Sequence, residues 1–212
     1  MDKIIEKTLE NLRKNNMAAY YAETKQDALD IVKSLLKKGE TVSCGGSETL
    51  KQSGIRDFMD SGDFNFLDRA KTKSDEEINE LYRKVFFCDA YLTSANAVTE
   101  DGELINVDGN CNRIAAITYG PRSVIFVVGK NKIGNDVPQC FKRVKTVAAP
   151  LNAKRLGCDT PCAKNGVCIK PDELPAAGCN SPQRICANYV VSGRQRIKDR
   201  IKVIICNESL GY

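Results

Sequence analysis

Histidine is absent from this chain of 212 residues, and so is tryptophan. Without histidine, the chain can form neither a Ser-His-Asp triad nor a Cys-His pair, and no imidazole can bind a metal ion. General acid–base chemistry in this protein therefore falls to Asp, Glu, Lys, Tyr or Cys side chains.

Aromatic residues and net charge are scarce. Aromatic side chains make up 7% of the chain, and 32 basic against 27 acidic residues leave a net charge of +5. Nucleic-acid-binding proteins usually gather basic side chains on one face and add aromatic side chains that stack on bases. The densest basic stretch, Arg194–Lys202, contains Asp199 and lies between two predicted strands, so we expect a solvated hairpin end. The sequence thus predicts no nucleic-acid partner.

Long apolar runs are also missing. No segment approaches the roughly 20 apolar residues that cross a bilayer. The first residues, Met1–Lys7, mix charged and apolar side chains and lack the apolar stretch of a signal peptide. We therefore expect a cytoplasmic protein with no membrane partner. Hydrophobic residues make up 42% of the chain, which is enough for a packed core.

Short apolar runs alternate with amphipathic stretches along most of the chain. Helices are predicted over about 2–15, 25–38, 48–52, 74–87, 112–119 and 135–148, the fourth beginning with a capping box of Ser74 and Glu77. Strands are predicted over 17–22, 41–44, 64–67, 90–99, 104–107, 123–128, 187–191 and 201–206. The strand at 123–128 is so apolar that both its faces should be buried at the centre of a sheet. This order predicts the α/β class, with a mostly parallel sheet covered by helices on both faces.

Two adjacent glycines, Gly45 and Gly46, follow the predicted strand 41–44, and Ser47 and Thr49 come directly after them. Glycines let backbone N–H groups approach a ligand, and the start of the next helix is partially positive, so this loop can bind a phosphate or carboxylate. A plain strand-to-helix turn is the alternative. The loop is neither a Walker loop nor a dinucleotide fingerprint, and the chain has no NAD or flavin fingerprint.

Polar side chains follow other predicted strands as well. Asn96, Asp108 and Asn112 do so, and Arg113 stands at the start of a helix, where a positive charge opposes the helix dipole. Because ligands bind at the carboxyl ends of parallel strands, we predict one pocket for a small anionic metabolite. Asn and Asp residues that merely shape turns are the alternative. The predicted ligand-binding residues are Gly45, Gly46, Ser47, Thr49, Asn96, Asp108, Asn112, Arg113 and Lys132.

Cysteines are plentiful, at ten in the chain. Five of them lie between Cys158 and Cys186, in a segment interrupted by Pro and Gly. In a reducing compartment such a cluster indicates metal ligands more than disulfides. Four thiolates suffice for zinc or for an iron–sulfur cluster, and the lack of CxxC pairs weakens the case for zinc. Cysteines that act as small buried hydrophobic residues are the alternative.

Three segments resemble one known family. They are VSCGGSETLKQSGI at 42–55, the stretch at 89–133 that contains TSANAVTEDG and VVGKNKI, and the tail at 179–212 that begins CNSPQRIC. These segments are similar to the LUD-domain family, whose members are associated with bacterial lactate utilization. The resemblance covers nearly the whole chain and implies one LUD-like domain over 1–212. It also implies a three-layer α/β/α sandwich similar to sugar-phosphate isomerases and CoA transferases, and other lactate-utilization proteins as partners.

The resemblance extends to the cysteines. The family tail carries the patterns PC, GxC and CNSPxRxC, which here match Cys162, Cys168, Cys179 and Cys186. It implies that these four bind metal within a Cys-rich C-terminal lobe at 157–186, and its electron-transfer setting favours a 4Fe–4S cluster over zinc. The gap after Cys168 is longer than in the family, so Cys158 is the natural substitute. Cys111 replaces a usual Gly, which would narrow the pocket or place a thiol in it.

Two functions fit these features, and whether the protein is an enzyme stays open. One is a redox accessory in the oxidation of a 2-hydroxy acid such as lactate, with a cluster beside an anion pocket. The other is a non-catalytic metabolite-binding or regulatory module with a structural zinc. A brown protein after purification without oxygen favours the first, and a colourless protein with one zinc favours the second.

Overall fold

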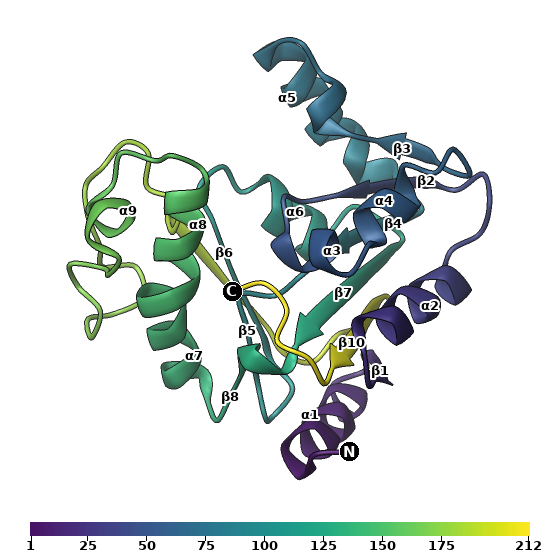
Figure 1. Cartoon of the computed structure of the whole chain (residues 1–212), viewed down its shortest axis with the longest axis horizontal. Helices are drawn as coiled ribbons and strands as arrows, with labels where there is room; N and C mark the ends of the chain where they lie inside the picture. The colour runs from purple at the N-terminus through teal and green to yellow at the C-terminus, as the bar shows by residue number, and fades with distance from the viewer.

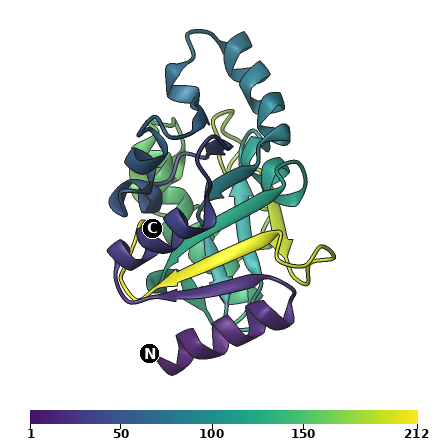
Figure 2. The ribbon, with the colours of Figure 1, turned by 90° about the vertical axis from the view of Figure 1, so that its right-hand side faces the viewer.

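The larger of two sheets has six strands, all parallel to their neighbours (Figures 1 and 2). The structure, a computed structural model, describes residues 1–212. In sheet order the strands are β1 (Ala18–Ala22), β10 (Ile201–Cys206), β7 (Ser123–Gly129), β4 (Ala90–Thr93), β2 (Thr41–Cys44) and β3 (Asn65–Leu67). The predicted mostly parallel sheet is confirmed, and β7 lies near its centre.

The apolar character of β7 explains its central place. Val124, Phe126 and Val128 pack into the core on one face of the sheet, and Ile125 and Val127 pack into the core on the other face. All five are 0% exposed. Since successive side chains of a strand point to opposite faces, a strand that is apolar at every position requires cover on both.

Helices supply that cover on both faces. On one face lie α1 (Lys3–Lys14) and α6 (Asn112–Thr118), and on the other lie α2 (Lys25–Leu35), α3 (Glu48–Gln52) and α4 (Ile55–Met59). The arrangement is consistent with the expected three-layer sandwich. No helix is both long and apolar enough to cross a membrane.

Helix α5 (Asp75–Lys84) projects from the body of the molecule and has no buried residue (Figure 1). The Ser74 side chain caps it by accepting a hydrogen bond from the Glu77 amide at 3.2 Å. The Glu77 carboxylate, however, accepts from the amide of Lys73, so the predicted capping box is only half formed. In a full capping box the Glu77 carboxylate would accept from the Ser74 amide, but here the Lys73 amide takes that place.

A second sheet, which the sequence did not predict, has the order β8 (Ile133–Gly134), β5 (Ala97–Thr99), β6 (Leu104–Asp108) and β9 (Asn188–Ser192). The predicted single strand over 90–99 is wrong, because the chain leaves the larger sheet after Thr93 and enters the smaller one at Ala97. At this break the Ser94 carbonyl and the Asn96 side chain accept hydrogen bonds from Arg113. These polar contacts replace sheet pairing.

The predicted hairpin at Arg194–Lys202 is wrong, since β9 and β10 belong to different sheets. Basic side chains of this loop hold main-chain carbonyls instead. Arg194 donates to Lys14, and Arg200 donates to Ile117 near the end of α6. Positive charges are favourable at a helix C-terminus, so this loop connects the two sheets and supports α6.

The helix predicted over 135–148 runs further. Helix α7 (Val137–Arg143) continues through a π-helical turn, Val144–Ala148, into α8 (Ala149–Arg155). The Asp136 side chain caps it by accepting from the Gln139 amide at 2.8 Å. The extra length brings α8 to the pocket described next, and π turns are frequent at such places.

Candidate functional site

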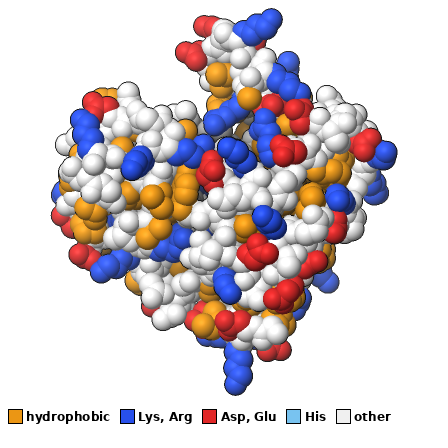
Figure 3. Space-filling model, viewed as in Figure 1, with side chains coloured by type: hydrophobic (Ala, Val, Ile, Leu, Met, Phe, Trp, Pro, Cys, Tyr) orange, Lys and Arg blue, Asp and Glu red, His pale blue; other side chains and the backbone are white.

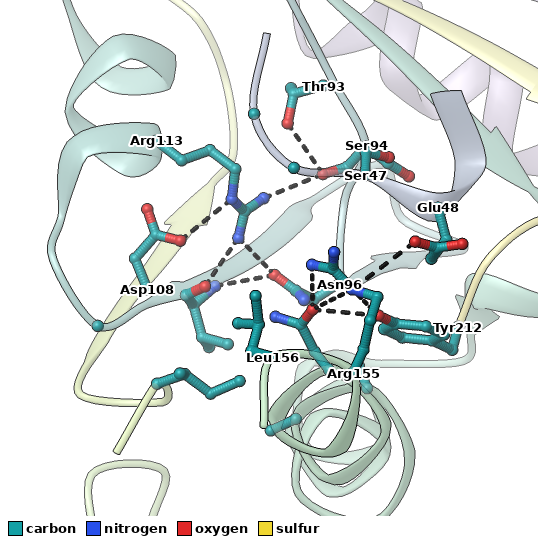
Figure 4. Close-up of a pocket in the computed structure, with 18 of the residues that line it drawn as sticks. Ser47, Glu48, Thr93, Ser94, Asn96, Asp108, Arg113, Arg155, Leu156 and Tyr212 are labelled. Atoms are coloured by element: carbon teal, nitrogen blue, oxygen red, sulfur yellow. Dashed lines mark hydrogen bonds and ion pairs between the residues drawn. The ribbon is translucent and has the colours of Figure 1, made fainter. Parts of the chain in front are cut away.

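A cavity of about 250 Å³ opens at the carboxyl ends of the parallel strands, beside α8 (Figure 4). Its walls come from the glycine loop after β2, the break after β4, the end of β6 with the start of α6, and the residues after β7. All nine residues predicted from the sequence line it: Gly45, Gly46, Ser47, Thr49, Asn96, Asp108, Asn112, Arg113 and Lys132. Their binding of a metabolite stays a prediction.

The glycine loop brings backbone close to two arginine side chains. A Cβ atom on Gly45 would lie 3.1 Å from Cδ of Arg113, and one on Gly46 would lie 2.8 Å from Nη2 of Arg69. The helix after the loop, α3, has only 5 residues, so the expected partial positive charge of a long helix is small. The glycines therefore serve mainly to leave room for the side chains of Arg113 and Arg69.

Several polar residues of the pocket escaped the sequence analysis. They are Glu48, Arg69, Asn152, Arg155, Arg184 and Tyr212. Arg155 lies beyond the predicted end of its helix, and its Nε donates to the Tyr212 hydroxyl at 2.6 Å across 57 positions of sequence (Figure 4). The i, i+3 spacing of Asn152 and Arg155 on one helix face was the only local signal that could have identified them.

The guanidinium group of Arg113 donates all its hydrogen bonds to other groups of the protein. Its Nε donates to Asp108 Oδ1 at 3.1 Å, and the two Nη atoms donate to the Ser94 carbonyl, Asn96 Oδ1 and the Val107 carbonyl at 2.7–3.0 Å (Figure 4). Nη1 also donates to Asn106 Oδ1 at 2.9 Å. A guanidinium has five N–H donors, so none is left for a ligand. Arg113 thus connects the walls of the pocket. These contacts explain why a positive charge stands at the start of α6.

Cys111 precedes α6 with a φ of 64°, in the left-handed region. Glycine adopts this conformation without the cost that other residues bear. A Gly at this position, as expected in the family, therefore has a backbone reason. Cys111 is not among the residues that line the pocket, so the expected narrowing or added thiol does not occur.

Lys132 is buried in the pocket wall, at 3% exposure. Its Nζ donates to the hydroxyls of Thr49 at 2.9 Å and Ser94 at 3.0 Å. Burial, with smaller contributions from the positive charges of Arg143 and Arg113, lowers the pKa of Lys132 to about 7. The amine is therefore partly neutral at physiological pH, as a buried lysine without a counter-ion tends to be.

Replacing Lys132 by Met is expected to raise the free energy of unfolding at pH 7. Between pH 7 and the ordinary lysine pKa of 10.5, the unfolded chain binds a proton that the folded chain does not, so wild-type stability rises with pH across this window. At pH 7 the buried lysine lowers the free energy of unfolding of the wild-type protein by nearly its full effect. That effect is on the order of a few kcal/mol, since one pKa unit corresponds to about 1.4 kcal/mol. Urea unfolding should show the advantage of the variant shrinking toward pH 10.5.

The matched control for this prediction is Lys130→Met, which removes an exposed lysine two positions away. We expect no pH-dependent difference between this control and the wild type. An advantage of Lys132→Met that stays constant from pH 7 to pH 10.5 would contradict the lowered pKa of Lys132.

Basic side chains gather where the part of the molecule with α8 meets the part with α3 and α6 (Figure 3). The pocket has five basic side chains, Arg69, Arg113, Lys132, Arg155 and Arg184, and two acidic ones, Glu48 and Asp108. Asp108 pairs with Arg113, and Glu48 lies 3.8 Å from Arg155. Arg69 forms no salt bridge and donates to the Tyr82 hydroxyl at 3.3 Å. The excess of positive charge suits an anionic ligand.

The Cys-rich segment 157–186 adjoins the pocket. Its one helix is α9 (Pro161–Asn165), and Pro182, Gln183, Arg184 and Ile185 line the pocket between Cys179 and Cys186. Arg184 donates to the carbonyls of Cys179 and Cys186, which holds this wall in shape. The lobe expected for this segment stays a prediction.

All ten cysteines are free thiols. Burial raises the pKa of Cys162, a hydrogen bond with the Thr160 hydroxyl lowers it, and the thiols of Cys186, Cys179 and Cys168 add smaller increases. No three Cys, Asp or Glu side chains are grouped closely enough to hold a metal ion as they stand. The buried hydroxyl of Tyr189 has no hydrogen-bond partner, and burial followed by the Cys186 thiol raises its pKa.

This fold and pocket define a class: an α/β protein with a basic, polar cavity at the carboxyl ends of a parallel sheet. The LUD domain matches residues 5–206, and the chain belongs to the LUD domain family. That membership places it in a family related to lactate utilization.

Comparison with one solved structure supports the fold. A DUF162 family protein from Deinococcus radiodurans aligns with a TM-score of 0.55 at 15% identity, over 97% of this chain and 97% of that one. The eIF2B delta protein from Chaetomium thermophilum aligns with a TM-score of 0.34 at 15% identity, over 64% of this chain and 52% of that one. No curated protein sequence matches the chain. The expected similarity to sugar-phosphate isomerases and CoA transferases stays a prediction.

Proposed function

We propose that this protein binds a small anionic metabolite, a 2-hydroxy acid such as lactate, and acts as a redox accessory in its oxidation. The observation that carries the proposal is the pocket's charge, because even without the partly neutral Lys132 four arginines stand against two carboxylates. Thr49, Ser94 and Asn96 add hydroxyl and amide groups that suit a hydroxyl-bearing ligand. The family's relation to lactate utilization suggests the ligand class.

Within this proposal Arg69 and Arg155 hold the carboxylate. Arg69 has no acidic partner, and the nearest carboxylate to Arg155, that of Glu48, is 3.8 Å away, so both can pair with an incoming anion. A guanidinium binds a carboxylate with two parallel hydrogen bonds, which fixes its orientation as well as its position. Arg113 keeps the Asp108 and Asn96 walls in place around the ligand.

We further propose that Cys162, Cys168, Cys179 and Cys186 bind metal, with Cys158 as the alternative to Cys168. Four thiols in one segment suit either a 4Fe–4S cluster or zinc, and a metal-bound Cys186 thiolate would be a stronger hydrogen-bond acceptor for the Tyr189 hydroxyl than the free thiol. A cluster, when bound, would supply one-electron transfer to another lactate-utilization protein. Residues 182–185, which lie between Cys179 and Cys186, line the pocket, so a metal bound by these two thiols would adjoin the pocket wall.

A second candidate is a non-catalytic regulatory module with a structural zinc. The pocket wall at residues 182–185 favours this candidate. A zinc ion that orders residues 179–186 would shape the pocket without any electron transfer. Purification without oxygen separates the two. A brown protein with iron and sulfide supports the redox accessory, and a colourless protein with one zinc supports the module.

Replacing Arg155 by Gln is expected to weaken lactate binding about tenfold or more. A hydrogen bond to a charged group contributes about 1.5–3 kcal/mol, and about 1.4 kcal/mol corresponds to a factor of ten. Isothermal titration calorimetry with lactate measures the change, and Arg69→Gln should behave similarly.

Lys154→Gln is the matched control, because Lys154 is an exposed cation on the same helix that does not line the pocket. We expect it to bind lactate as the wild type does. Equal weakening by Lys154→Gln and Arg155→Gln would mean that the overall charge of the protein, and not the pocket, attracts the anion.

A further inference from the structure

The chain contains two buried lysines in contrasting settings. Lys145, at 2% exposure, donates to the carbonyls of Lys170, Glu173 and Leu174 at 2.7–2.9 Å. An ammonium group has three N–H donors, and three carbonyls satisfy them all. This contact is what a structural buried lysine requires, because an unsatisfied buried charge is costly.

Lys132 has no such set of carbonyl acceptors. Its two partners are hydroxyl oxygens, those of Thr49 and Ser94, and each hydroxyl can point its own hydrogen at a carbonyl, Leu210 at 3.2 Å and Ala95 at 3.4 Å. Both hydroxyls therefore accept from the lysine. Two acceptors match the two N–H groups of a neutral amine and leave its lone pair unused.

The charges around Lys132 favour the same neutral state. No carboxylate lies within 4.0 Å of its Nζ, whereas Arg143 and Arg113 place positive charge nearby. The carboxylates of the pocket belong to Asp108, which pairs with Arg113, and Glu48, which faces Arg155. Burial beside other cations is a known way in which proteins make a lysine nucleophilic.

We propose that Lys132 is a catalytic nucleophile that forms an imine with the carbonyl carbon of a 2-oxo acid bound in this pocket. The proposal rests on the proposed function insofar as the pocket must hold a small carboxylate. It names the 2-oxo acid, the oxidised counterpart of a 2-hydroxy acid, as the class that reacts.

The chemistry balances without another reagent. The lone pair of Nζ attacks the carbonyl carbon, the C=O π electrons move to oxygen, and a proton passes from nitrogen to that oxygen to give a carbinolamine. Loss of the hydroxyl group with a proton releases one water and leaves the C=N bond. The hydroxyls of Ser94 and Thr49 are within hydrogen-bond distance of Nζ and can relay the proton.

The test is reduction of the imine by borohydride, with pyruvate as the 2-oxo acid probe. Borohydride delivers a hydride to the C=N carbon and makes a stable secondary amine, which peptide mass spectrometry locates as a carboxyethyl group. In the wild-type protein we expect the modification at Lys132, at least tenfold above any other lysine. Lactate, which has no carbonyl group to attack, should leave no modification under the same conditions.

Two variants test whether the trapped product forms at Lys132. Lys132→Arg should abolish the trapped product, whereas Lys130→Arg, at an exposed neighbour, should keep it. Modification of exposed lysines in proportion to their exposure, unchanged in Lys132→Arg, would overturn the proposal. So would an unmodified wild-type protein that calorimetry shows to bind pyruvate, and in that case the proposed metabolite binding would stand. An unmodified protein that binds neither pyruvate nor lactate would overturn both.

Discussion

Replacing Arg113 by Ala is expected to lower the free energy of unfolding by about 3–5 kcal/mol, the range for removing one partner of a buried ion pair. The side chains of Arg113 and Asp108 are each 14% exposed, and the change removes five hydrogen bonds that join segments around residues 94–96 and 106–108. The Asp108 carboxylate would stay largely shielded from water with only the Ile114 amide as partner. Urea unfolding followed by circular dichroism measures the loss.

Arg83→Ala provides the control. Arg83 forms a salt bridge with Glu80, but the two side chains are 72% and 64% exposed, and such pairs contribute at most about 1 kcal/mol. Arg113→Lys should restore little of the loss, since an ammonium cannot reproduce the planar set of five donors. A stable Arg113→Ala protein that has lost only lactate binding would show instead that this guanidinium serves the ligand.

Replacing Cys162, Cys179 or Cys186 by Ser is expected to abolish stoichiometric metal in protein purified without oxygen. Each change removes one thiolate of the proposed set, and a cluster or a zinc ion that needs four ligands is lost. Metal analysis combined with the visible absorption spectrum measures the effect. Whichever of Cys158→Ser and Cys168→Ser also loses metal identifies the fourth ligand.

Cys88→Ser and Cys140→Ser are the controls, because both thiols are buried in hydrophobic clusters and neither belongs to the proposed ligand set. They should keep the metal even if they lower stability. Loss of metal from the Cys162, Cys179 and Cys186 variants should also lower the midpoint of thermal unfolding and weaken lactate binding, because residues 182–185 line the pocket. Full metal content in all three variants would show that the metal is bound elsewhere, and wild-type protein without metal would exclude the site.

The predicted elements and the observed ones agree where burial follows a regular period. The apolar run of β7 required a covered position, and the alternation of helices with short strands required the parallel sheet. The capping of α2 by Thr24, whose side chain accepts from the Asp27 amide, is equally local. Such features depend on residues a few positions apart, which a single sequence displays directly.

The smaller sheet shows where local patterns fail. The run from Ala90 to Thr99 looks like one long strand, but Arg113 and Arg143, 17 and 47 positions beyond Asn96, both donate to Asn96 at the break between β4 and β5. The pairing of β6 with β9 likewise joins Leu104 to Ser192. Contacts across such separations leave no periodic signal in the chain.

The same division applies to the pocket. The sequence by itself determined that the glycine loop, Asn96 and Lys132 would meet, because the parallel strands that they follow bring their carboxyl ends to one edge. Asp108 ends β6 of the smaller sheet, so its place in the pocket depends on the tertiary structure. Only the tertiary structure decided what each does there. Arg113 has its donors satisfied by segments distant in sequence, Arg155 arrives on a helix longer than predicted, and Lys132 has no acid nearby. Charge state and free hydrogen-bonding capacity depend on burial and on every neighbour in space, and those are properties of the folded chain.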